Sequence, residues 1–123
     1  MNAPLLSKDE LQMVKEALIL PIMMDYIQDD IHLANQSGFK LDLLLVHSLE
    51  QVQGQIFQEH YALKRALRER GIKLFPEKRT DTGIDADYLC RGYTHHITLL
   101  WDILRTEVLT KASHYMNVKL TSG

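Results

Sequence analysis

The polar residue best placed for chemistry is His60, because it falls within a stripe of apolar residues at helical spacing. Leu49, Ile56, Leu63 and Leu67 form that stripe, so the imidazole is expected to point into the protein. A buried imidazole needs a hydrogen-bonding partner or a metal ion, since an unsatisfied buried polar group costs about 1–3 kcal/mol. His60 is therefore the first candidate for a functional side chain.

Three further residues could complete a metal site with His60. Glu59 precedes it in the chain, and His96 and Glu107 lie beside the core face of a helix expected over 85–116. Histidines with a carboxylate suit transition metals, and helical bundles build such sites between facing helices. The alternative, which we favour, is a core histidine bonded to a polar side chain of a neighbouring helix. We thus expect no cofactor, with a transition metal at these residues as the rival.

The sequence lacks the common catalytic motifs. It has no phosphate-binding glycine loop, dinucleotide fingerprint, Gly-x-Ser-x-Gly elbow or His-Glu-x-x-His, and each of these motifs carries a known mechanism. A single cysteine, Cys90, excludes an internal disulfide and a cysteine-based zinc cage. No segment has the length of a membrane span or the pattern of a secretory signal. We expect a non-enzymatic protein of the cytoplasm, without catalytic residues.

Charge is distributed unevenly along the chain, although the net charge is only −2. Residues 1–63 hold three lysines and nine acids, whereas 64–79 holds seven cations and two acids. The seven cations are Lys64, Arg65, Arg68, Arg70, Lys73, Lys78 and Arg79. We favour pairing of these cations with acids that begin the first and third expected helices. The alternative is a surface that binds an anion or, less favoured, nucleic acid.

Apolar periodicity predicts three long helices, and 46% apolar with 24% charged residues is typical of a globular protein. Apolar residues recur at helical spacing over 8–37, 41–70 and 85–116. A chain of 123 residues has the size of one domain. We therefore predict an all-α fold, a single helical-bundle domain of three long helices over 1–123.

Local signals set the expected ends of these helices. Ser7 followed by Glu10 is a capping-box pattern, and Gly38 is a plausible left-handed cap. Pro21 predicts a kink or break in the first helix. We expect 72–84 to be an inter-helix loop and 117–123 to be a frayed tail.

The predicted helices have more apolar surface than three helices can bury. Tyr26, Leu44 and Tyr61 lie beside or away from the main stripes, and a helix this widely apolar usually has a second partner. Gly54 and Gly92, which are costly inside helices, indicate close helix crossings. We therefore expect a homodimer that completes a four-helix or larger bundle.

Together these features favour a protein-interaction or regulatory module that acts through a helical surface. A metal-binding bundle is the first alternative, and anion or nucleic-acid binding through 64–79 is the second. No membrane partner is expected. The candidate contact residues are Tyr26, Leu44, Tyr61, Lys64, Arg65, Arg68 and Arg79.

Overall fold

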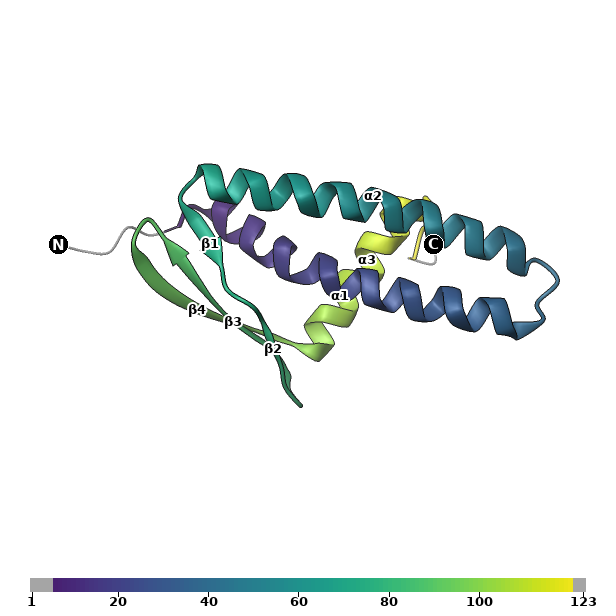
Figure 1. The fold of residues 1–123 in the computed structure, drawn as a ribbon. Helices are drawn as coiled ribbons and strands as arrows, with labels where there is room; N and C mark the ends of the chain where they lie inside the picture. The colour runs from purple at the N-terminus through teal and green to yellow at the C-terminus, as the bar shows by residue number, and fades with distance from the viewer. Residues whose placement is uncertain (1–5, 121–123) are drawn as a thin grey trace.

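The computed structural model describes residues 6–120 and shows an α+β fold, in which three helices and one antiparallel sheet share a core (Figure 1). The predicted all-α bundle of three long helices is therefore wrong. In chain order the elements are α1 (Lys8–Ser37), α2 (Asp42–Glu69), β1 (Ile72–Leu74), β2 (Lys78–Arg79), β3 (Gly83–Cys90), β4 (Tyr93–Leu100) and α3 (Trp101–Met116).

The predicted ends of α1 are confirmed. The Glu10 amide donates a hydrogen bond to Ser7 Oγ at 3.1 Å, and the Ser7 amide donates one to Glu10 Oε1 at 3.1 Å. This reciprocal pair satisfies two of the amides that a helix start leaves free. The helix ends at Gly38, whose φ of 72° is the left-handed conformation that glycine adopts without strain.

The predicted break near Pro21 does not occur, because α1 runs without interruption through it. A proline inside a helix removes one backbone hydrogen bond. Its neighbours Leu20 and Ile22 are each only 1% exposed and belong to the main core. Tertiary packing of this kind supplies most of the stability of a helix in a protein, so it can offset a local loss.

The α1–α2 pair projects beyond the rest of the molecule. Figure 1 shows the two helices lying side by side, with the connection at 38–41 extending past the sheet and past α3. We call the projecting part of the two helices, next to residues 38–41, the distal end of the α1–α2 pair. None of the helices in the described range is long and apolar enough to cross a membrane.

The sheet is built around β3. β4 pairs with one edge of β3 over its whole length, from Gly83 opposite Leu100 to Cys90 opposite Tyr93. β1 and β2 are the other two partners of β3, and all pairings are antiparallel. Arg91 (φ 48°) and Gly92 (φ 94°) form the turn between β3 and β4. Two successive left-handed residues are what a tight two-residue hairpin turn requires.

The third predicted helix, over 85–116, is wrong in its first half and correct in its second, where α3 lies. In β3, side chains alternate: Ile84, Ala86 and Tyr88 are buried, whereas Asp87 is exposed. That period of two is the signature of a strand with one face on a core. The helix was predicted because apolar residues also recur three or four positions apart in this segment. The alternation of buried and exposed side chains was not considered.

Residues 72–84, predicted to be a loop between helices, instead contain β1, β2 and the first residues of β3. Ile72 is buried and Leu74 is half-buried, so this segment contributes to the core. The predicted tail begins where α3 ends, at Met116 with Asn117 as its left-handed cap. Residues 121–123 of that tail lie outside the described residues.

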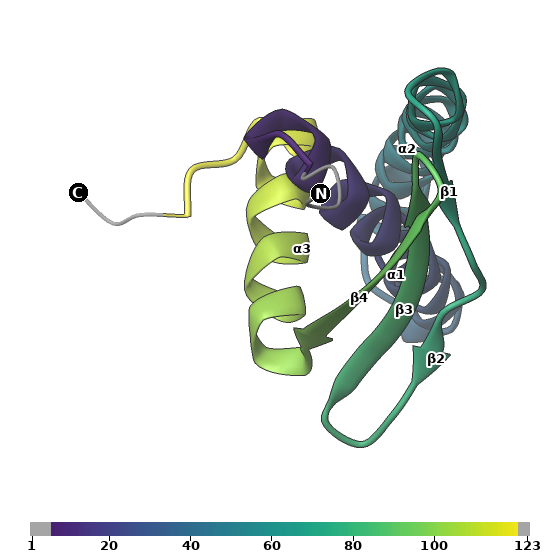
Figure 2. The same cartoon turned by 90° about the vertical axis from the view of Figure 1, so that its left-hand side faces the viewer.

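Hydrogen bonds attach the turn of the β3–β4 hairpin to α1 and to the end of α2, and the start of α3 to the segment between β2 and β3; Figure 2 shows how these elements are arranged. At the turn, the Arg91 amide donates a hydrogen bond to the Gly71 carbonyl at 2.8 Å, just after α2. Arg91 Nη1 and Nη2 donate to the Glu10 carboxylate of α1 at 3.1 and 3.2 Å. At the other end, Trp101 Nε1 donates to the Thr80 carbonyl at 2.7 Å.

Candidate functional site

α2 carries a second line of side chains on the face turned away from the core, which we call the outer stripe. Its eight positions follow one another at alternating steps of four and three residues, and all are exposed. They are Leu43, His47, Glu50, Gly54, Phe57, Tyr61, Lys64 and Arg68. Steps of four and three keep residues on one side of a helix, so these side chains form one continuous surface.

The outer stripe is apolar in the middle and at one end. Phe57 is 61% exposed, Tyr61 is 67% exposed and Leu43 is 66% exposed. A β-carbon added at Gly54 would meet no atom within 4 Å. The centre of the stripe is therefore a shallow recess beside two exposed aromatic rings, and aromatic side chains of this kind are enriched at protein interfaces.

The distal end of the α1–α2 pair has a second apolar surface. Leu33, Phe39, Leu41 and Leu44 are each more than 60% exposed. A hollow of about 730 Å³ opens between the two helices where α3 ends, with Met116 at its inner limit. We call this hollow the distal groove. Leu44, a predicted contact residue, lies beside it.

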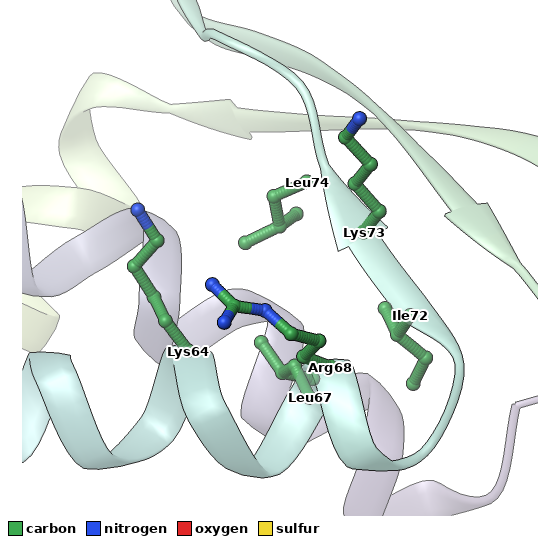
Figure 3. A pocket seen from close by; sticks show the side chains of 6 residues that line it. All are labelled: Lys64, Leu67, Arg68, Ile72, Lys73 and Leu74. Atoms are coloured by element: carbon green, nitrogen blue, oxygen red, sulfur yellow. The ribbon is translucent and has the colours of Figure 1, made fainter.

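A basic hollow of about 490 Å³ lies between the last turns of α2 and the strand β1. Its lining combines Lys64 and Arg68 with the apolar side chains of Leu67, Ile72 and Leu74. Figure 3 shows the charged ends of Lys64 and Arg68 rising from α2 on the side where Leu74 lies. The ammonium group of the remaining lining residue, Lys73, is directed away from α2.

Several cations of the basic segment pair within the fold, but among residues 6–120 only Arg70 pairs with an acid that begins one of the expected helices. Arg70 lies 3.7 Å from the Glu10 carboxylate, and Arg79 lies 2.5 Å from that of Asp25. Arg65 lies 3.8 Å from Glu69, one turn further along α2.

Lys64 and Arg68 differ from those cations. Neither has a carboxylate within 4 Å among residues 6–120. Of the predicted contact residues, the fold thus brings Tyr61, Lys64 and Arg68 together on one face of α2. It leaves Tyr26 half-buried on α1.

His60 lies at the edge of the core, half-buried on α2. Burial lowers its pKa below the usual 6.5, the charge of Lys64 lowers the pKa further, and a hydrogen bond with the Ala17 backbone acts in the opposite direction. Glu59 accepts a hydrogen bond from the Tyr115 hydroxyl of α3. Burial, followed by this bond, raises the pKa of Tyr115. His60 therefore connects α2 to α1, and Glu59 connects α2 to α3.

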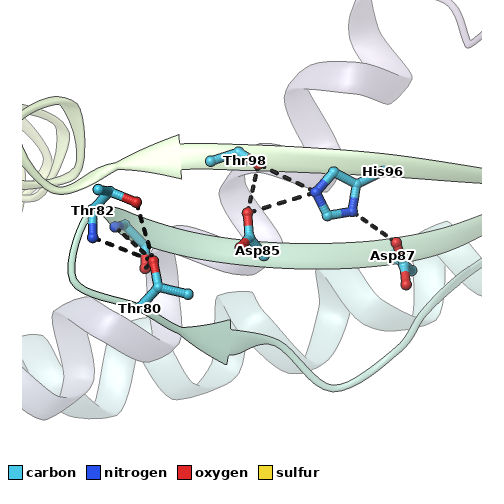
Figure 4. A network of polar contacts seen from close by, with 7 residues as sticks. Thr80, Thr82, Asp85, Asp87, His96 and Thr98 are labelled. Atoms are coloured by element: carbon cyan, nitrogen blue, oxygen red, sulfur yellow. Dashed lines mark hydrogen bonds and ion pairs between the residues drawn. The ribbon is translucent and has the colours of Figure 1, made fainter.

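His96 lies on β4 rather than on a helix, and its side chain is exposed (Figure 4). Its Nδ1 is 2.8 Å from Asp87 Oδ1, and its Nε2 is 3.6 Å from Asp85 Oδ1. The Thr98 hydroxyl donates a hydrogen bond to Asp85. The hydrogen bond with Asp87 is the main cause that raises the pKa of His96 above 6.5. This network links β3 to β4 on the solvent side of the sheet.

The four predicted metal ligands have different surroundings. His60 and Glu59 lie on α2, His96 lies on the exposed face of β4, and Glu107 lies on α3 beside a small hollow lined also by Leu99. No group of three or more histidine, cysteine, aspartate or glutamate side chains within 6–120 is arranged to hold a metal ion. The geometry thus gives the metal hypothesis no support.

Sequence reasoning missed the cross-strand network of Asp85, Asp87, His96 and Thr98. The available signal was the pair of patterns Asp-x-Asp and His-x-Thr, which place polar side chains on one face of two strands. In a helix the same residues would point in different directions, so the wrong element assignment hid their relation.

By fold and surface, the chain is a small α+β protein with a projecting helical pair, and residues 6–120 contain no group of side chains arranged to hold a metal ion. A family model described as YhjD protein matches residues 5–120, so the chain belongs to the YhjD protein family. No curated protein matches the chain. No solved structure matches it either.

Proposed function

We propose that this protein is a non-enzymatic interaction module of the cytoplasm that acts as a homodimer through its α1–α2 pair. The observation that carries the proposal is the exposure of large apolar side chains on these two helices. They are Leu33, Phe39, Leu41, Leu43, Leu44, Phe57 and Tyr61. Contiguous exposed apolar surface, rimmed by polar residues, is typical of protein-interaction sites.

A second copy would supply the layer that the projecting pair lacks. Two helices side by side bury only one face each, whereas two pairs from two chains can form a four-helix arrangement with a common core. Removing apolar surface from water contributes roughly 25 cal/mol per Å², so covering several leucine and aromatic side chains favours association. This reasoning favours the chain itself as the partner.

The cytoplasmic assignment is supported by the state of the one cysteine. Cys90 is a free thiol that is fully buried in the core, on the inner face of β3. A free buried thiol acts as a small apolar side chain and is typical of proteins kept in reducing compartments.

The proposal is tested by replacing exposed apolar side chains and following the mass of the protein in solution. Leu44→Gln combined with Phe57→Gln removes apolar surface beside the distal groove and from the outer stripe of α2, and should weaken self-association. Leu109→Gln is the matched control, because Leu109 is 58% exposed but lies on α3. If the wild-type chain stays monomeric, or if the control weakens association as much as the double variant, the proposal fails.

A second candidate function, anion binding, is favoured by the basic hollow. Lys64 and Arg68 line it without carboxylate partners in the described range, and a small anion such as phosphate would satisfy them. Titration with inorganic phosphate, followed by NMR, should then shift signals of Leu67, Ile72 and Leu74. The combined variant Lys64→Gln and Arg68→Gln should abolish those shifts, while Lys40→Gln should keep them. Unchanged wild-type spectra would rule this function out.

A further inference from the structure

We propose that two copies of this chain pair α2 against α2 in antiparallel orientation along the outer stripe, about a two-fold axis beside Gly54 and Phe57. This inference rests on the proposed homodimer and specifies which face and which register it uses. The stripe extends from Leu43 to Arg68, which is about 38 Å along the helix.

The spacing of the stripe fits a helix partner. Alternating steps of four and three average 3.5 residues, which is the repeat that lets two helices stay in contact over several turns. The eight positions cover almost the whole of α2 (Asp42–Glu69). The core-facing side of α2 is a separate surface, with Val46, Leu49, Val52 and Ile56 buried against the rest of the molecule. One helix thus presents two faces, and the described residues of its own chain cover only one of them.

Gly54 explains how two such helices could approach closely at the centre. A glycine inside a helix costs roughly 0.5–1 kcal/mol relative to alanine, so its presence needs a reason. Residues 6–120 of its own chain give none, because among them a β-carbon at Gly54 would meet nothing within 4 Å. In the antiparallel pair, Gly54 of each copy lies opposite Phe57 of the other, and the missing β-carbon makes room for the ring.

The charges of the stripe select the antiparallel orientation. Glu50 lies on the N-terminal side of Gly54, while Lys64 and Arg68 lie on the C-terminal side. In an antiparallel pair Glu50 lies opposite Tyr61 of the second copy and within one turn of its Lys64. A parallel pair would place Glu50 against Glu50 and Lys64 against Lys64, which is unfavourable. The second copy thereby supplies a carboxylate to Lys64, for which the described part of its own chain supplies none within 4 Å.

The same register accounts for the mixed lining of the basic hollow. It brings Leu43 of the second copy to the level of Arg68, which lines the hollow. Leu67, Ile72 and Leu74 offer an apolar floor that a leucine side chain could cover. The stripe thus has an exposed Leu43 at one end and a complementary apolar floor at the other. Because of the two-fold symmetry, this contact would form twice in the dimer.

A charge swap tests the pairing directly. Glu50→Lys alone and Lys64→Glu alone should each weaken the dimer about tenfold or more, measured as its dissociation constant by sedimentation equilibrium. The double variant E50K/K64E should restore the dissociation constant to within about threefold of wild type, because the two residues exchange roles across the axis. Restoration is the result expected if the two positions are neighbours in the dimer, and a double variant as weak as the single ones would contradict the register.

Gly54→Gln tests the recess without harming the fold, because the added side chain meets open space in the single copy and improves helix propensity. It should weaken the dimer about tenfold or more and leave the helical circular dichroism signal intact. A wild-type chain that is monomeric at every concentration overturns both the homodimer and the register. A dimer that tolerates Gly54→Gln and both single charge changes overturns the register alone, and its loss in Leu33→Gln with Leu44→Gln would place the contact at the distal groove.

Discussion

At the scale of single residues, Glu10 joins parts of the chain that are far apart in the sequence. It closes the capping box of α1 with Ser7 and accepts hydrogen bonds from Arg91 in the β3–β4 turn. Within the described range it is the buried charged residue, at 7% exposure. Arg91 and then the Ser7 backbone lower its pKa from 4.5 to about 2. The carboxylate is thus strongly preferred over the acid in the folded state.

The low pKa of Glu10 predicts acid-dependent stability. Because its pKa is lower in the folded state, the contribution is fully present above about pH 4.5. It is lost as the pH falls toward 2. Arg91→Asn, which suits the left-handed turn position, should lower the unfolding midpoint at pH 7 and move the pKa of Glu10 toward 4.5. Arg105→Asn, which changes an exposed arginine of α3, is the control. An unchanged Glu10 titration in the Arg91 variant, followed by NMR, would show that Arg91 does not hold this carboxylate.

The pKa values of two histidines are shifted in opposite directions by the fold. The pKa of His60 is lowered, mainly by burial, and that of His96 is raised, mainly by Asp87. For His96 the stabilising contact is fully present below about pH 6.5 and is lost as the pH rises through the raised pKa. Asp87→Asn should lower the pKa of His96 and leave that of His60 unchanged. NMR of the imidazole signals measures both, and titration of the two rings in the reverse order would contradict these assignments.

At the scale of elements, the two long helices are readable from sequence and the hairpin is not. Ser7, Glu10 and Gly38 act through contacts within a few residues, so their roles follow from local patterns. Pro21 lies in α1 without breaking it because distant packing holds the helix there. In β3 the alternation of Ile84, Ala86 and Tyr88 overlaps by chance with a helical spacing of apolar residues.

The candidate surface was predictable in part for the same reason. Tyr61, Lys64 and Arg68 fall on one face of α2 because helical spacing alone places them together. The surroundings of His96 depend on the pairing of β3 with β4, a contact that helical spacing cannot reveal. Arg91 and Gly92 form a left-handed turn between two strands, and the helical interpretation instead took Gly92 as a close crossing of helices.

The contrast between two glycines gives a prediction at this scale. A β-carbon at Gly83 would lie 2.1 Å from the Leu99 carbonyl oxygen of β4, whereas one at Gly54 meets nothing within 4 Å. Gly83→Ala should therefore destabilise the protein by about 2 kcal/mol or more, because β3 must move away from β4. Gly54→Ala should stabilise the single copy by roughly 0.5–1 kcal/mol. Urea denaturation at low protein concentration measures both, and equal effects would argue against the close approach at Gly83.

At the scale of the whole molecule, the sheet and α3 cover one part of the α1–α2 pair and leave the rest open. Among residues 6–120, every large apolar side chain that is more than 60% exposed lies at the distal end or on the outer stripe of α2. Two cations that have no carboxylate within 4 Å among residues 6–120, Lys64 and Arg68, lie at the end of the same stripe. The proposed second copy would satisfy both features at once.

The most direct test is sedimentation equilibrium of the full chain over a wide range of concentration at low and high salt. We predict that the mass rises with concentration from 14.2 kDa toward twice that value. We also predict that high salt shifts the equilibrium toward the single chain, because it screens the contacts between Glu50 and Lys64. A mass of 14.2 kDa at every concentration would contradict the homodimer, and a dimer indifferent to salt would contradict the role of these charges.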